Sequence, residues 1–139
     1  MHVALGFDSG FKVVSLETGE LLATANVPGE VRRVVVGGNT LVSCADSVRI
    51  WGLVVDDAGA VTGVEALHAF HGGEFVSSTY VVAAIDGNEV FLAGRKLIVC
   101  DRNGAVQQTI TEALPKHAKN IHGMSVVFRV VFSKRGGGA

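Results

Sequence analysis

A short segment that combines a polar turn with an apolar run recurs three times, and this repeat limits the folds that the chain can adopt. The copies run from Asp8 to Gly19, from Cys44 to Gly52 and from Gly94 to Gly104. Self-similarity over a few tens of residues is typical of stacked units, each of which buries its apolar face against its neighbour. The chain is therefore expected to form a row of similar small sheets.

Equivalent positions in the three copies set the repeat length. Val14, Trp51 and Cys100 occupy corresponding points and are 37 and 49 positions apart. The mean, about 43, lies within the period of about 40–45 residues that is typical of a four-stranded unit. The longer second interval indicates an insertion near Val54–Val61.

Valine-rich runs alternate with Gly, Asn, Asp and Ser clusters along the whole chain, as strands and turns do. Several of these clusters, such as Thr18–Gly19 and Asn103–Gly104, can supply the positive φ angles of tight hairpins. The fold class expected is all-β, with antiparallel four-stranded units. The expected strands are Val3–Phe7, Phe11–Leu16, Leu21–Asn26, Val31–Val36, Leu41–Cys44, Val48–Val55, Gly63–Phe70, Val76–Ile85, Val90–Ala93, Lys96–Cys100, Ala105–Thr111 and Ser125–Phe132.

Composition excludes several classes of protein. With 48% hydrophobic and 18% charged residues, the 139-residue chain can bury a core and does not match an intrinsically disordered protein. A formal net charge of -1 provides no overall attraction to nucleic acid or anionic lipid. We expect one domain over residues 1–132 and a flexible glycine-rich tail over residues 133–139.

The chain shows no sign of export or membrane insertion. Its start lacks a basic region followed by an apolar run, and no stretch approaches the roughly 18 apolar residues of a membrane helix. The only cysteines, Cys44 and Cys100, are far apart and have no Cys-x-x-Cys context. We expect an intracellular protein of the cytoplasm or the nucleus, with no membrane partner.

The second copy carries a family resemblance. Asp46–Trp51 resembles the signature that ends the third strand of a WD40 repeat, and Asp8–Gly19 is similar with Val14 in place of the tryptophan. Gly29–Val34 resembles the innermost strand that opens the next repeat. His71–Val76 is similar to the glycine-histidine region before another innermost strand, although the order of the two residues is not kept.

The resemblance covers most of residues 3–132 and implies about three blades of a β-propeller, which form an incomplete ring. In WD40 repeats an aspartate, a histidine, a hydroxyl and a tryptophan form a structural hydrogen-bond network, and Asp46, Ser43 and Trp51 would take three of these roles. The matching histidine is absent, because Val27–Gly29 occupies its place. Arg95 breaks the pattern in the third copy. The structural repeat positions are Asp8, Val14, Ser43, Asp46, Trp51, His71, Cys100 and Asp101.

The expected strand count suggests how the ring is completed. If a blade runs from an innermost strand a to an outer strand d, the chain reads b-c-d, then a-b-c-d twice, then a final a. Propellers have about four to eight blades, so three are too few for an ordinary ring. One hypothesis is a homodimer that closes a six-bladed ring, in which each chain donates Ser125–Phe132 to the other's first blade. The alternative is a piece of a longer propeller.

The candidate chemical groups point to structural roles. The histidine pairs, His68 with His71 and His117 with His122, have no third metal ligand at a recognised spacing. Asp56–Asp57 and Glu112 fall in connections, where solvated side chains are the rule. Both cysteines are flanked by apolar strand residues, which is typical of core positions. We expect no catalytic residue, metal or cofactor.

The function expected is therefore noncatalytic: a protein–protein interaction scaffold that binds partners through the ends of its blades. This step rests on analogy of fold, which does not by itself determine function. One alternative is an RNA- or ribonucleoprotein-associated scaffold, for which the basic pairs Arg32–Arg33 and Lys134–Arg135 are the weak signal. The other is a propeller-type hydrolase. Trp51 is expected in the core of a blade rather than at an interface.

Overall fold

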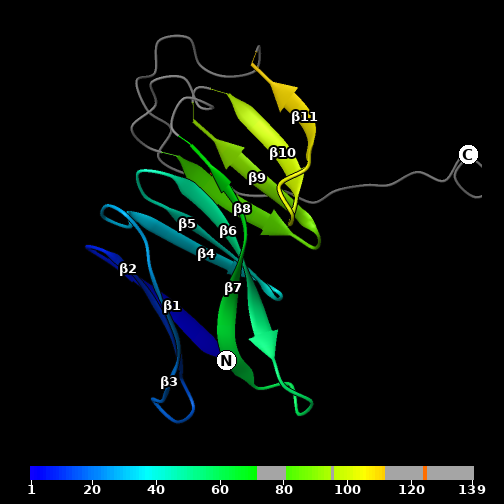
Figure 1. Cartoon of the computed structure of the whole chain (residues 1–139). Coiled ribbons are helices and arrows are strands. Elements are labelled where there is room, and N and C mark those ends of the chain that lie inside the picture. The colour runs from blue at the N-terminus through cyan, green and yellow to red at the C-terminus, as the bar shows by residue number, and fades with distance from the viewer. Residues whose placement is uncertain (72–80, 95, 112–123, 125–139) are drawn as a thin grey trace, which may run out of the picture.

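A computed structural model describes residues 1–71, 81–94, 96–111 and 124, which form eleven strands in three antiparallel sheets. The sheets are stacked one on another in chain order, with the first at the N-terminal end of the row (Figure 1). The described part of the chain contains no helix, so it has none long and apolar enough to span a membrane.

The first sheet has three strands and the other two have four each, and within every sheet consecutive strands are neighbours. The first sheet consists of β1 (His2–Phe7), β2 (Gly10–Ser15) and β3 (Leu21–Asn26). The second consists of β4 (Arg33–Gly37), β5 (Thr40–Cys44), β6 (Val48–Val55) and β7 (Val61–Phe70). The third consists of β8 (Val82–Asp86), β9 (Glu89–Ala93), β10 (Leu97–Asp101) and β11 (Val106–Ile110).

The turns follow the residues that the sequence places there. Gly19, Gly38, Gly59, Gly87 and Gly104 all have positive φ angles, between 57° and 86°. Such angles are open to glycine because it has no Cβ, and they allow a hairpin to reverse within a few residues.

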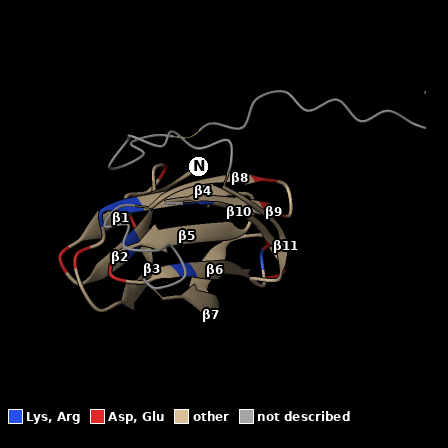
Figure 2. Cartoon of the chain, turned by 90° about the horizontal axis from the view of Figure 1, so that it is seen from above, with Lys and Arg blue, Asp and Glu red and all other residues tan. Residues whose placement is uncertain are grey.

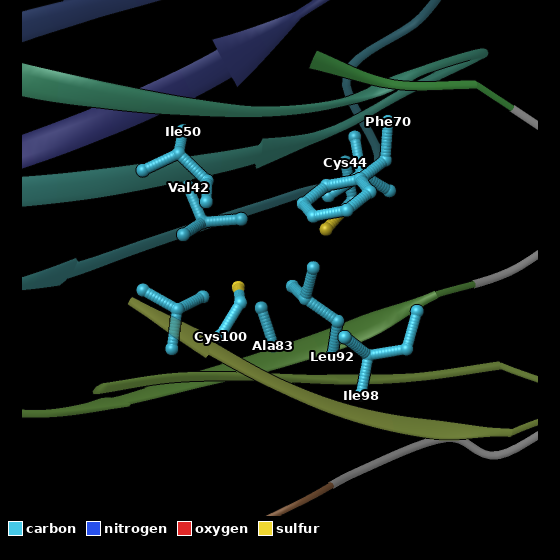
Figure 3. Packing of buried hydrophobic residues seen from close by; sticks show 10 residues of the cluster. Val42, Cys44, Ile50, Phe70, Ala83, Leu92, Ile98 and Cys100 are labelled. Atoms are coloured by element: carbon cyan, nitrogen blue, oxygen red, sulfur yellow. The ribbon is translucent and has the colours of Figure 1, made fainter. Parts of the chain in front are cut away.

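Two apolar cores hold the stack together, one at each junction between sheets. Between the second and third sheets, residues from β5, β6 and β7 face residues from β8, β9 and β10 (Figure 3). Ile50, Leu92 and Cys100 are fully buried there. Between the first and second sheets, Phe11 and Val13 pack against side chains of β5, β6 and β7. The second sheet is thus covered on both faces.

A polar contact also joins the second and third sheets. The Arg102 side chain, in the turn after β10, donates from Nε to Thr40 Oγ1 at 3.1 Å and from a terminal nitrogen to the Asn39 carbonyl at 3.0 Å. These partners lie in the hairpin between β4 and β5, more than sixty residues earlier in the chain. Arg102 therefore fixes the turns of two sheets relative to each other.

This architecture confirms the all-β class and the strand order expected from the sequence. The predicted strands Leu21–Asn26 and Val48–Val55 coincide with β3 and β6. The expected insertion near Val54–Val61 takes the form of a long β6–β7 hairpin rather than a separate loop. The predicted strand Ser125–Phe132 and the start of Val76–Ile85 lie outside the described residues.

Several predicted strand ends differ from the observed ones by one or two residues, and the difference at the start of β4 has a clear physical reason. The sequence predicts that a strand opens at Val31, whereas β4 begins at Arg33. The Val31 N–H donates to the Phe7 carbonyl of the first sheet at 3.0 Å. Val31 therefore belongs to the junction between sheets rather than to the ladder of the second.

Candidate functional site

A buried polar pair lies at the centre of the second sheet. The Trp51 indole N–H donates to Ser43 Oγ at 3.0 Å, and the two residues are 8% and 1% exposed. Phe11 of the first sheet meets the indole edge to face, with ring centroids 5.1 Å apart and an interplanar angle of 74°. This geometry is favourable for aromatic pairs, so the pair contributes to the contact between the two sheets.

Asp46 lies in the turn between β5 and β6, beside the connection that leads into β4. Its carboxylate rests against Gly29, whose φ is +86°. A Cβ at Gly29 would lie 2.5 Å from the Asp46 Cγ, a distance that real side chains do not reach. The glycine therefore makes room for the carboxylate at the place where a WD40 repeat would carry its histidine. The structure brings Ser43 and Trp51 together and sets Asp46 beside the glycine.

The three positions that anchor the repeat point in the same direction. Cys100 faces the second sheet, and Trp51 faces the first. Val14 lies on the opposite face of β2 from buried Val13, so it points away from the second sheet. Each anchor thus faces the N-terminal end of the row.

The remaining repeat positions occupy strand ends. Asp8 is exposed in the turn between β1 and β2, and His71 is exposed directly after β7. At the end of β10, Asp101 Oδ1 accepts hydrogen bonds from the backbone N–H groups of Asn103 and Ala105, both at 2.9 Å. Asp101 thereby stabilises the tight turn that positions Arg102.

Several side chains that could take part in chemistry have structural roles. Asp56 Oδ1 accepts hydrogen bonds from the N–H groups of Ala58 and Ala60, both at 2.9 Å, and so caps its own turn. His68 meets Phe70 edge to face, with ring centroids 4.4 Å apart. Within the described ranges, no three His, Cys, Asp or Glu side chains converge as metal ligands would. Glu112, His117 and His122 lie outside these ranges.

Both cysteines are free thiols in the core between the second and third sheets. Burial raises the pKa of Cys44 to about 12, and the nearby Arg33 partly offsets this effect. Burial, together with the carboxylate of Asp101, raises the pKa of Cys100 to about 11. A nucleophilic cysteine needs a thiolate, which raised pKa values disfavour at neutral pH.

The first sheet has an open inner edge along β1. In the second and third sheets, a further strand forms this edge: β4 lies beside β5, and β8 lies beside β9. The strand β1 corresponds to β5 and β9 and has no such neighbour among the described strands. The Leu16 N–H donates to the Met1 carbonyl at 3.0 Å, so the backbone polar groups of Met1 point toward β2. In an antiparallel pair, the backbone N–H and C=O groups of successive residues point alternately toward the partner strand and away from it. The groups of His2, Ala4 and Gly6 therefore point toward the open edge. No described strand lies beside them.

The outer face of the first sheet is apolar and exposed. Leu5 is 53% exposed and Phe7 is 36% exposed, and both lie on the face opposite the core. Lys12, directly across from Leu5, holds its Nζ 5.6 Å from the centroid of the Phe7 ring. The open edge and this face are adjacent, and together they form the candidate interaction site.

Comparison with solved structures shows what the stack of sheets is. Over 81% of its length, the chain superposes on the β-propeller domain of Cps50 (Swd1) from Myceliophteria thermophila, with a TM-score of 0.59 and 14% identity. It also superposes over 86% of its length on BamB from Moraxella catarrhalis, with a TM-score of 0.63 and 14% identity. The chain is a partial β-propeller. This confirms the predicted fold, and each sheet is one blade.

The chain spans 40% of the length of the Cps50 domain and 36% of that of BamB. No family model matches the sequence, and no curated protein matches it. The similarity therefore establishes the fold alone.

Sequence reasoning missed two features of this partial propeller. One is the exposed face formed by Leu5 and Phe7, and the other is the Arg102 contact between blades. Apolar Leu5 and Phe7 alternate with the small residues Ala4 and Gly6, which is the only signal of the exposed face in the sequence. Arg102 gives no such signal, because its partners are distant in the chain.

Proposed function

We propose that the chain is a noncatalytic protein–protein interaction scaffold built from WD40-like blades. The observation that carries this proposal is the first blade, whose three described strands leave the edge of β1 open beside the exposed apolar side chains of Leu5 and Phe7. An exposed sheet edge accepts an extended segment through backbone hydrogen bonds, and adjacent apolar side chains add buried area. The site fits another polypeptide.

The rigidity of the blade stack supports the same proposal. Two buried cores and the Arg102 contact fix the blades before any partner arrives. A preformed surface loses little conformational freedom on binding, which favours affinity. The chain can therefore bind a partner at the β1 edge or at the blade ends without a prior ordering step.

The charge of the residues that the structure describes supports protein over nucleic acid as the partner. Acidic side chains gather at several hairpin turns, while the strands between carry few charges (Figure 2). Binding of nucleic acid depends on lysine and arginine side chains that neutralise phosphates. The acidic residues in or at the edge of these connections are Asp8, Glu17, Glu20, Asp46, Asp56, Asp57, Asp86 and Asp101.

The proposal is tested by capture of partners on the tagged full-length chain and on two matched variants. Leu5→Asp places a charge on the candidate site, opposite Lys12, where the new carboxylate pairs favourably and the blade is preserved. Val106→Asp changes a residue of nearly equal exposure, 51% against 53%, on the third blade. Thermal melting of both variants checks that the fold is intact.

The scaffold proposal expects a defined set of proteins on the wild-type chain and on Val106→Asp, retained after nuclease treatment and at high salt. The same set is lost from Leu5→Asp. Release by nuclease, or a steep loss of binding with added salt, would favour the RNA-associated alternative instead. Equal capture by all three chains would show that the candidate site is not used.

A further inference from the structure

The edge of β1 is a slot for one strand. In the second blade, β4 lies against β8 on one side and against β1 on the other. At Gly6 a Cβ would lie 2.7 Å from Val31 Cγ1 and 3.1 Å from Val34 Cγ2, so the second blade approaches β1 closely. A whole sheet that paired with the β1 edge would collide with the second blade. A single extended segment needs only the width of one strand, about 4.8 Å.

We propose that a second copy of this chain fills the slot, with its residues Ser125–Phe132 added beside β1 as the innermost strand of the first blade. This inference rests on the proposed interaction site and names its partner. The open edge offers the N–H and carbonyl groups of His2, Ala4 and Gly6. A donated strand would satisfy them by antiparallel pairing.

The sequence of the donated segment suits an innermost strand. Its residues lie outside the described part of the chain, and their order in the sequence follows a two-residue pattern. With the two-residue period of a strand, Val126, Phe128, Val130 and Phe132 share one face, and all four are apolar. That face would complete the core between the first and second blades, beside Val31 and Val34.

The exposed outer face indicates that the strand comes from a second copy. A strand of the same chain would pair with β1 but would leave Leu5 and Phe7 exposed to water. A second molecule would supply both the strand and a body to cover this face. Val82 and Val99, on the face of the third blade that points away from the second, are 2% and 7% exposed. Among the described residues, the first blade therefore has the more exposed apolar outer face.

The origin of the segment fits donation from the inner side of the stack. Met124 lines a cleft of about 390 Å³ with Arg32–Val35 and Val82–Ala83. It thus lies beside the innermost strands β4 and β8, one blade away from the slot in its own chain. Packed sheets are about 10 Å apart, so a segment that crosses to the slot of its own chain would use about three residues on the way. Those residues would not be available to pair with β1.

Disulfide trapping between two co-expressed variants tests the donation. One copy carries Ala4→Cys at the open edge, and the other carries a single cysteine at position 126, 128 or 130, with different affinity tags. The native thiols cause little background, since both are buried and their pKa values are raised to about 12 and about 11. Gln108→Cys, at an exposed position of β11 on the third blade, is the control for Ala4→Cys, because it lies away from the candidate site.

The proposal expects a disulfide-linked dimer carrying both tags for one of the three positions, and none with Gln108→Cys. A double variant with both cysteines in one chain separates the sources of the strand. If that chain forms only an internal disulfide and stays a monomer, donation from a second copy is wrong. The absence of any crosslink at all three positions would also overturn the proposal.

A proline variant gives an independent readout. Ala4→Pro removes an N–H that points to the open edge, where proline is tolerated in an edge strand. It is expected to convert dimer to monomer while the circular dichroism spectrum is retained, and Gly136→Pro in the tail is expected to remain dimeric. A dimeric Ala4→Pro would contradict the proposed pairing. A monomeric Ala4→Pro would support the strand donation whether or not the capture of other proteins changes. A change in that capture bears on the scaffold proposal alone.

Discussion

Removal of the Trp51 side chain should destabilise the protein strongly. Truncation of a buried large aromatic residue costs about 3–5 kcal/mol, because apolar burial is lost and a cavity remains. Trp51 fits that class, since it is 8% exposed and packs edge to face on Phe11. Trp51→Ala also leaves the hydroxyl of Ser43 without its partner at a position that is 1% exposed. We expect a loss of about 3–5 kcal/mol in the free energy of unfolding.

Milder substitutions separate the hydrogen bond from the packing. Trp51→Phe keeps an aromatic ring against Phe11 but leaves Ser43 unpaired, whereas Ser43→Ala leaves the indole N–H unpaired. An unpaired buried polar group costs about 1–3 kcal/mol, so each change should destabilise the protein by about that amount. Because the double variant removes both partners, its cost should be smaller than the sum of the single costs.

Urea unfolding followed by far-ultraviolet circular dichroism measures these differences. Trp51 is the sole tryptophan, so fluorescence cannot report on its own replacements. All variants are compared at one protein concentration, since association shifts apparent stability. An unchanged midpoint for Trp51→Ala would refute the buried role of this residue. Strict additivity of Trp51→Phe and Ser43→Ala would refute the coupling through the hydrogen bond.

Four further experiments have defined outcomes. Gly29→Ala, which combines a positive φ with contact against a carboxylate, should lower the melting temperature more than Gly19→Ala, which has a positive φ and open space; equal shifts would contradict the close approach. Arg102→Ala should lower the free energy of unfolding by at most about 3 kcal/mol, because Arg102 is partly exposed, and should speed amide exchange in the β4–β5 turn. Unchanged exchange would show that the contact does not couple the blades. Cys44 and Cys100 should resist thiol reagents at pH 8 until the protein unfolds, and rapid labelling of the native state would contradict their burial. Because their pKa values are raised in the folded state, stability should be unaffected below about pH 9 and should fall as the pH rises toward about 11, since only the unfolded chain then loses thiol protons; a flat profile above pH 9 would count against these shifts.

Much of the fold could be predicted because its signals are local. Val48–Val55 reads as a strand from its own residues, and Gly59 marks the reversal that follows it. The order of strands in each blade then follows from the chain, since consecutive antiparallel strands are joined by short turns. The repeat of Val14, Trp51 and Cys100 indicates that the units are alike. Local chemistry therefore determines the blades.

The contacts between blades could not be predicted, because they join residues far apart in the chain. Nothing near Phe11 indicates that its ring will meet Trp51, and nothing near Arg102 indicates Thr40 as a partner. The start of β4 was misplaced for the same reason, since the Val31 N–H bonds to Phe7 of another blade. The candidate site was foreseen only as a missing strand, and its apolar face depends on the three-dimensional position of Leu5.

The mass of the 139-residue chain in solution tests the central claim most directly. Light scattering behind size exclusion, over a range of concentrations, compares the particle with the chain mass of 14.5 kDa. An unfinished first blade completed by a second copy predicts a homogeneous species of twice that mass. A folded, soluble species that stays at 14.5 kDa at all concentrations would contradict the account.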